Sequence, residues 1–295
     1  MLEVDGVTRT YGETKAVDDV SFTVSSGAMV GFVGGNGAGK TTTMRMIMGI
    51  LSPDQGAVRW HGNELTQGMR TRFGYMPEER GLYPKQPTLD QLVYLGRLHG
   101  MTQTKAKARV SELLERFGLG MRMSDKVEAL SLGNQQRAQI IAAVLGDPVA
   151  LILDEPFSGL DPAAVDQMSA LLREYTSAGV PVLFSSHQLD LVDRLCDSIV
   201  VLHHGKVVAD GTSDQLRDTG QVRYRLTVGQ DAGWVRDLAG VRVLDVDGAA
   251  ALVELESDSE QAAQDLLQQA LRHGPVHEFS KVIPSPSEVY RQVAA

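Results

Sequence analysis

Short apolar runs alternate with helical patterns from the N-terminus to about residue 217. The runs Met29–Val33, Ala150–Leu153 and Val182–Ser185 contain almost no polar positions, which is typical of strands buried on both faces of a parallel sheet. Between about residues 84 and 139 the pattern is mainly helical, as in AKARVSELLERFG. This alternation predicts an α/β domain over residues 1–217 with a helical insertion over residues 84–139.

The pattern changes after about residue 220, where strand-like and helix-like segments are shorter. Their order is strand, short helix, two strands, amphipathic helix with a serine or aspartate cap, and a last strand. This β-α-β-β-α-β order predicts a small α+β, ferredoxin-like domain over residues 221–295. The segments are VRYRLTV, DAGWVRDLAG, VRVLDV, AALVELE, SDSEQAAQDLLQQALRHG and VHEFSKVI.

Composition places the chain among globular proteins. It has 295 residues, of which 43% are hydrophobic and 22% charged, so it can bury a full core. No apolar run approaches the roughly 20 residues that cross a bilayer, and the N-terminus lacks the pattern of a signal peptide. The single cysteine, Cys196, fits a reducing cytoplasm. The formal net charge of −9 argues against a nucleic-acid surface.

A glycine-rich stretch, GGNGAGKTT, follows the run MVGFV and precedes the helical pattern TTTMRMIMG. It matches G-x-x-x-x-G-K-[ST], and strand, glycine loop and helix are the context in which that pattern binds nucleotide. Lys40 is predicted to reach the β- and γ-phosphates, and the Thr41 hydroxyl to ligate Mg²⁺. The alternative is an ordinary glycine turn. The residues expected to contact nucleotide here are Gly34, Asn36, Gly37, Gly39, Lys40, Thr41 and Thr42.

The run ALILDEP ends in two adjacent carboxylates, Asp154 and Glu155. Open α/β sheets place ligands at the carboxyl ends of strands. Asp154 is suited to hold Mg²⁺, and Glu155 to polarise an attacking water as general base. The alternative is a helix-capping acidic pair before Pro156. His187 ends the following run, VPVLFSSH; a lone histidine is usually only a satisfied polar residue, but this position favours a γ-phosphate contact.

Together these elements resemble the ATP-binding subunit of an ABC transporter over roughly residues 1–217. LSLGNQQR stands where that family has its signature, commonly LSGGQ followed two residues later by arginine. Leu132 replaces the first glycine and Asn134 the glutamine, whereas Ser131 and Gly133 remain. The resemblance implies that Ser131 and Gly133 contact the γ-phosphate of an ATP held by another subunit, because a serine-capped helix start is an anion site.

Other residues follow from the same resemblance. Tyr11 matches the aromatic residue that stacks on adenine, with a core tyrosine as the alternative. Asp161 belongs to SGLD, the loop that communicates between the two sites. Glu78, in GYMPEERGLYP, stands where the family's lid glutamine contacts Mg²⁺ and water. A carboxylate also ligates Mg²⁺ but adds negative charge beside phosphate, so the role of Glu78 is left open.

The resemblance further implies a P-loop NTPase core, ATP and Mg²⁺ as cofactors, and a second ATPase subunit that closes the site head to tail. Integral-membrane permease subunits would dock around residues 78–94, which places the chain at the cytoplasmic face of the cell membrane. GYMPEERGLYP and the tail KVIPSPSEVYRQV resemble a subgroup that drives export, including sodium- and drug-efflux ATPases.

Two other functions compete with this interpretation. A soluble ABC-type ATPase acting on nucleic acid or ribosomes would carry a coiled-coil insertion, or two ATPase domains with a basic linker. This chain has one glycine loop and an acidic balance. The other alternative is a module that binds nucleotide without hydrolysing it, because its signature is defective. The intact residues Lys40, Asp154, Glu155 and His187 argue against it.

Overall fold

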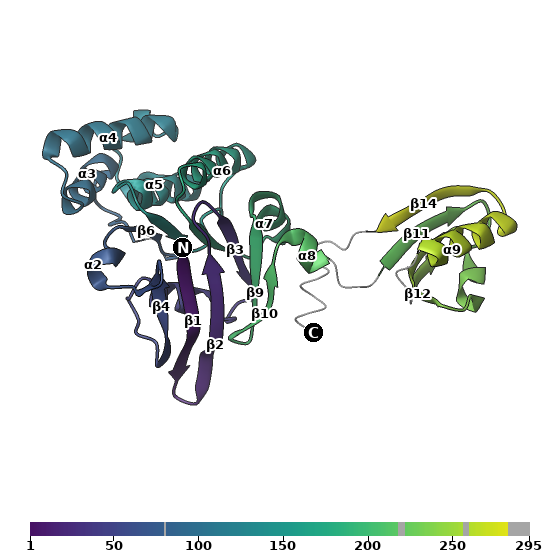
Figure 1. Cartoon of the computed structure of the whole chain (residues 1–295). Helices are drawn as coiled ribbons and strands as arrows, with labels where there is room; N and C mark the ends of the chain where they lie inside the picture. The colour runs from purple at the N-terminus through teal and green to yellow at the C-terminus, as the bar shows by residue number, and fades with distance from the viewer. Residues whose placement is uncertain (80, 218–221, 256–259, 283–295) are drawn as a thin grey trace. The chain divides into compact units, whose positions relative to one another are not determined.

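The computed structural model describes residues 1–79, 81–217, 222–255 and 260–282 (Figure 1). Contacts within the chain divide it into a larger unit, Met1–Ser213, and a smaller unit that begins at Asp214. The predicted cap of the amphipathic helix and most of the tail KVIPSPSEVYRQV lie outside the described residues. In the part of the chain that is described, no helix is both long enough and apolar enough to span a membrane.

A six-stranded sheet forms the centre of the larger unit, in the order β10-β9-β3-β8-β7-β6. Neighbouring strands from β9 to β6 run parallel, and β10 pairs antiparallel with β9 at one edge. All three predicted runs are strands of this sheet, and β3, β7 and β8 are buried along their whole length. The strands are β3 (Met29–Gly34), β6 (Phe73–Met76), β7 (Ala150–Leu153), β8 (Val182–Ser186), β9 (Ser198–His203) and β10 (Lys206–Gly211).

A second, antiparallel sheet has the order β2-β1-β4-β5. Helix α1 contacts β1 and β2 of this sheet and β3 of the parallel sheet, so one core is shared between the two sheets. Phe22 of β2 and Phe32 of β3 meet there with ring centroids 5.1 Å apart. The elements are β1 (Leu2–Tyr11), β2 (Thr14–Val24), β4 (Gln55–Trp60), β5 (Asn63–Glu64), α1 (Lys40–Ile47) and α2 (Gln67–Arg70).

The predicted helical insertion contains two helices and the start of a third, and two short 3₁₀ turns lie between the second helix and the third. Helices α3 and α4 pack on each other and on α5, which in turn packs on β6 (Figure 1). Further along the chain, α6 packs on β8 and α7 on β3. The elements are α3 (Thr88–Leu98), α4 (Gln103–Arg116), η1 (Gly120–Arg122), η2 (Val127–Ala129), α5 (Leu132–Val144), α6 (Pro162–Ser177), α7 (Leu189–Leu195) and α8 (Ser213–Arg217).

The smaller unit confirms the predicted ferredoxin-like order of strands. Its antiparallel sheet has the order β12-β13-β11-β14, in which the first and third strands of the unit lie at the centre. The predicted first helix is only a 3₁₀ turn, η3, because Gly233 and Gly240 weaken a helix there and Asp231 Oδ1 accepts the Gly233 N–H at 2.5 Å. The elements are β11 (Val222–Val228), η3 (Gly233–Asp237), β12 (Val241–Asp247), β13 (Ala250–Leu255), α9 (Glu260–His273) and β14 (Val276–Val282).

Gly74 of β6 sets how closely helix α5 approaches the sheet. A Cβ at this position would lie 2.2 Å from the Ala143 carbonyl oxygen of α5. We expect Gly74→Ala to lower the free energy of unfolding by about 1–3 kcal/mol, because backbone atoms must move apart. Urea unfolding measures this. The matched control is Gly68→Ala, where nothing lies within 4 Å, and equal stability of the two variants would contradict the prediction.

Candidate functional site: a phosphate loop facing three carboxylates

Parallel register brings four strand ends to one edge of the central sheet. Val33 is paired with Ser186, and Met76 with Leu153. The next residues in the chain therefore emerge together: the glycine loop after β3, Asp154 after β7, and His187 after β8. This is the edge at which open α/β sheets hold ligands.

The glycine loop curls between β3 and α1. Gly37 and Gly39 have φ values of +79° and +104°, in the left-handed region that favours glycine. A Cβ on Gly39 would also lie 2.6 Å from the Ala16 carbonyl oxygen. Helix α1 begins directly after Gly39 with no side-chain cap. Its first N–H groups and positive dipole end are thus available to an anion.

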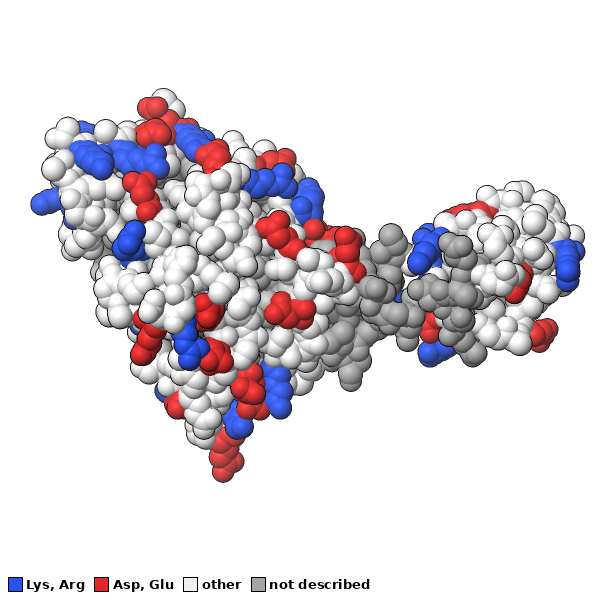
Figure 2. Space-filling model, in the orientation of Figure 1, with Lys and Arg blue, Asp and Glu red and all other residues white. Residues whose placement is uncertain are grey.

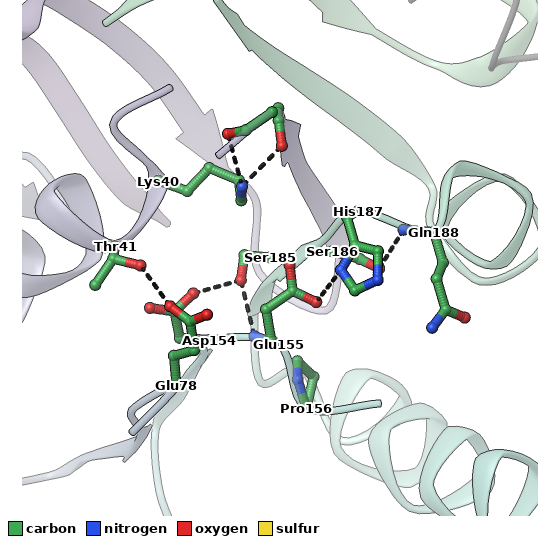
Figure 3. Close-up of polar contacts among 12 residues, drawn as sticks. Lys40, Thr41, Glu78, Asp154, Glu155, Pro156, Ser185, Ser186, His187 and Gln188 are labelled. Carbon is green, nitrogen blue, oxygen red and sulfur yellow. Dashed lines mark hydrogen bonds and ion pairs between the residues drawn. The ribbon is translucent and has the colours of Figure 1, made fainter. Parts of the chain in front are cut away.

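Lys40 lies along the inside of this loop and is only 8% exposed. Its ammonium group donates to the carbonyl oxygens of Gly34 at 2.7 Å and Gly35 at 3.2 Å (Figure 3). A buried ammonium group needs such acceptors or an anion. The loop therefore combines a fixed positive charge with uncapped backbone N–H groups.

Asp154 is almost fully buried, at 1% exposure. Its Oδ1 accepts a hydrogen bond of 2.5 Å from the Ser185 hydroxyl, while its Oδ2 is buried without a hydrogen-bond partner among the residues that the structure describes. An unpaired buried carboxylate oxygen is costly unless a cation or donor meets it. The Thr41 hydroxyl, which contacts Glu78 Oε2 at 3.5 Å, lines the same cavity. Oxygen ligands of this kind fit Mg²⁺.

Glu155 has an unusual backbone conformation, with φ at +51°. This left-handed region costs a non-glycine residue roughly 1–2 kcal/mol. The Glu155 N–H donates to Ser185 Oγ at 2.8 Å, and the Glu155 carboxylate contacts His187 Nδ1 at 3.0 Å (Figure 3). Neither Asp154 nor Glu155 caps a helix, since the next helix, α6, begins at Pro162. The capping alternative is therefore wrong.

Most of the predicted nucleotide residues line one cavity of about 440 Å³, within the size range of ligand pockets. A second cavity of about 560 Å³ shares Asn36, Glu78 and Glu155 with it and also contains His187. The lining of the first cavity is Ala16, Asn36, Gly37, Ala38, Gly39, Lys40, Thr41, Thr42, Glu78, Asp154 and Glu155.

Five predicted residues lie outside both cavities. One of them, Gly34, ends β3, and its carbonyl oxygen accepts from the Lys40 ammonium group. Tyr11, at the end of β1, is 51% exposed, so it is not a core tyrosine; the Arg9 guanidinium lies 5.3 Å from its ring centroid. Ser131 caps α5 by accepting the Asn134 N–H at 3.4 Å. Gly133 is in the first turn of α5, and Asp161 caps α6 by accepting the Ala164 N–H at 2.7 Å.

Two buried residues that hold the site together, Ser185 and Gln136, are not predicted by the sequence patterns above. Ser185 bonds both carboxylate residues, and the Gln136 amide donates to the carbonyl oxygens of Glu155 and Pro156. A signal existed for Ser185, because a polar residue inside the apolar run VPVLFSSH must find a partner when it is buried. Gln136 gave no such signal.

Fold and site together define a P-loop NTPase. The model of the ABC transporter family matches residues 17–158, and that of the C-terminal domain of DrrA1-3-like ATP-binding proteins matches residues 211–294. The chain is 39% identical to an uncharacterised ABC transporter ATP-binding protein, YhaQ, of Bacillus subtilis, over 98% of this chain and 97% of that one. It is 32% identical to the daunorubicin/doxorubicin resistance ATP-binding protein DrrA of Streptomyces peucetius, over 98% and 91%.

A solved ATP-binding subunit of an ABC transporter superposes with a TM-score of 0.68 at 36% identity, over 74% of this chain and 92% of that chain. The chain belongs to the ABC transporter ATP-binding proteins, and its activity is that of an ABC ATPase. The predicted P-loop core and the predicted class of function are thereby confirmed. Subunits of this family dimerise and work with membrane permeases.

The Ser185 hydroxyl is the point where the two carboxylate residues are joined. Ser185→Ala removes the donor to Asp154 and the acceptor of the Glu155 N–H, so two buried groups lose a partner. We expect the free energy of unfolding to fall by about 2–4 kcal/mol, measured by urea denaturation. Ser186→Ala is the control: within the described residues it removes one acceptor, that of the Gln188 N–H. An equal or larger loss of stability in Ser186→Ala would contradict the prediction.

Proposed function

We propose that the chain hydrolyses ATP with Mg²⁺ in a site that two subunits complete, and that it powers export through separate integral-membrane permease subunits. One observation carries the proposal of a shared site: Ser131 and Gly133, the two family residues retained in the signature, lie outside the cavity that holds Lys40 and Asp154. A serine-capped helix start that binds phosphate would therefore act on the nucleotide of a second subunit.

In this proposal the loop residues bind the phosphates. Lys40 exchanges its carbonyl partners for β- and γ-phosphate oxygens, and the uncapped N–H groups at the start of α1 donate to phosphate. Thr41, Asp154 and Glu78 would hold Mg²⁺, which would offset the negative charge of the phosphates. The exposed Tyr11 ring stacks on adenine. The remaining proposed contacts come from Gly34, Asn36, Gly37, Gly39, Thr42 and Asp161.

Glu155 and His187 perform the chemical step. The Glu155 carboxylate accepts a proton from the attacking water. His187 is 59% exposed in its side chain, so it is free to contact the γ-phosphate while its Nδ1 orients Glu155. Loss of the γ-phosphate contacts then opens the dimer, and this opening drives the permease.

Export is proposed because the relative DrrA is named for drug resistance, and because residues 1–217 and 221–295 would form the same two domains as in that relative. Work on a membrane partner places the subunit at the cytoplasmic face of the cell membrane. Nucleic acid is not the expected partner. On the face shown in Figure 2, acidic and basic side chains are interspersed over the larger unit, and the longest described helix, α6, has 16 residues, too short for a coiled-coil arm.

Removing the proposed base should trap the closed dimer. We expect Glu155→Gln to release phosphate at least about 100-fold more slowly, and to have the mass of a monomer without nucleotide and of a dimer with ATP–Mg²⁺. Light scattering after size exclusion measures the mass. Ser131→Arg, combined with Glu155→Gln, should abolish the dimer, because the added charge and bulk occupy the proposed phosphate contact. A dimer that forms equally well with Ser131→Arg would contradict a shared site.

Glu78 adds a third carboxylate to the cavity, and its negative charge should affect the binding of both ATP and Mg²⁺. Without Mg²⁺, Glu78→Gln should bind ATP several-fold more tightly, because one charge facing the phosphates is removed. With ATP saturating, it should need several-fold more Mg²⁺ for half-maximal phosphate release, because a metal ligand becomes neutral. Titrations of ATP and of Mg²⁺ test the two parts. Glu79→Gln is the control, since Glu79 does not line either cavity.

A further inference from the structure

Helix α5 reaches the catalytic segment through one buried amide. The Gln136 side chain is 7% exposed. Its Nε2 donates to the Glu155 carbonyl oxygen at 2.9 Å and to the Pro156 carbonyl oxygen at 3.1 Å. Both acceptors belong to the turn that carries the proposed base. A side chain of the signature helix therefore holds the backbone of the base in the same chain.

The Glu155 backbone is fixed from two sides in a conformation that it would not keep alone. Its φ of +51° lies in the left-handed region, where a non-glycine residue persists only if its surroundings determine it. Ser185 accepts its N–H from β8, whereas Gln136 donates to its carbonyl oxygen from α5. The Ser158 N–H also donates to that oxygen, at 3.2 Å. The direction of the Glu155 carboxylate thus depends partly on where α5 lies.

A second contact joins the first turn of α5 to the same segment. A Cβ on Gly133 would lie 3.1 Å from the Gly159 carbonyl oxygen, so the two backbones approach closely. Leu132 and Gln136 line the 560 Å³ cavity together with Glu155. Gln136 stands about 7–8 Å along the helix axis from Ser131. A shift of the helix start is therefore carried directly to the Gln136 amide.

We propose that Gln136 is a positioning residue that ties the geometry of Glu155 to the position of helix α5. The glutamate of one chain is then set for hydrolysis when the signature helix of that chain is docked on the partner's nucleotide. This inference rests on the proposed function, because it needs the shared site and Glu155 as the base. It assigns to Gln136 a role in turnover and none in nucleotide binding.

The same helix supplies a matched control. Gln139 is 4% exposed, and neither atom of its amide has a hydrogen-bond partner among the described residues. It lies on α5, one turn after Gln136, and differs from it in that its amide makes no hydrogen bond to the Glu155 turn among the described residues. Methionine resembles glutamine in length and volume but cannot donate. Gln136→Met and Gln139→Met therefore remove the same group from the same helix.

The test compares phosphate release by these two variants of the full chain. We expect Gln136→Met to lower kcat about 10- to 100-fold, because a small displacement of the base has effects of that size. Its KM for ATP should stay within about twofold of the unaltered chain, since no phosphate-binding group is touched. Gln139→Met should have the same kcat and the same KM for ATP as the unaltered chain. In the Glu155→Gln background, Gln136→Met should still form the ATP-dependent dimer.

Three outcomes would overturn the inference. These are an unchanged kcat for Gln136→Met, a similar fall for Gln139→Met, or a rise in KM in proportion to the loss of kcat, which indicates a merely structural role. If Gln136→Met does not fold, Gln136→Glu replaces it, because it has nearly the same shape but turns an acceptor toward two carbonyl oxygens. Its kcat should fall at least as far, and normal turnover would overturn the inference.

A failure of the proposed function and a failure of the role of Gln136 give different results. Unchanged phosphate release by Glu155→Gln would show that Glu155 is not the base, and the proposed function would fail. Slow release by Glu155→Gln together with normal turnover by Gln136→Met would leave the proposed function intact and reject only the role of Gln136.

Discussion

The functional site depends on the parallel register of the central sheet. Strand β3 pairs with β8, β8 with β7, and β7 with β6, so their carboxyl ends lie at one edge. A shift of one residue in any pair would turn the terminal side chains to the opposite face. Asp154 and Lys40 would then no longer line the same cavity. The apolar runs that form these strands are buried on both faces, as is typical of a parallel sheet.

Burial also explains how the site keeps unfavourable groups in place. The site concentrates a buried ammonium, a glutamate in the left-handed region, and a buried carboxylate with one oxygen that has no hydrogen-bond partner in the described part of the chain. Each of these costs free energy in the folded chain. Ser185, fully buried in β8, offsets part of the cost by bonding Asp154 and Glu155 at once. Groups that are strained in this way are preorganised for ligand and need little rearrangement when it arrives.

The two parts of the chain that we propose to contact nucleotide are separate in space but linked in structure. The loop and carboxylates lie at the sheet edge, whereas Ser131 begins a helix that packs on β6 through Gly74. Helix α5 is therefore bound to the sheet and, through Gln136, to the turn after β7. The first turns of α5 therefore carry both Ser131, at the helix start, and Gln136, which contacts the Glu155 backbone.

Local patterns of the sequence determined the apolar strands, the glycine loop, the Asp154–Glu155 pair and the helix cap at Ser131, because each depends on neighbouring residues in the chain. The ferredoxin-like order followed from the same patterns, except that local glycine and aspartate chemistry reduced one helix to a 3₁₀ turn. Tertiary structure alone decided the roles of Ser185 and Gln136. Their partners lie 19–31 residues away, so packing of strand on strand and helix on turn, which no local pattern encodes, brings them together.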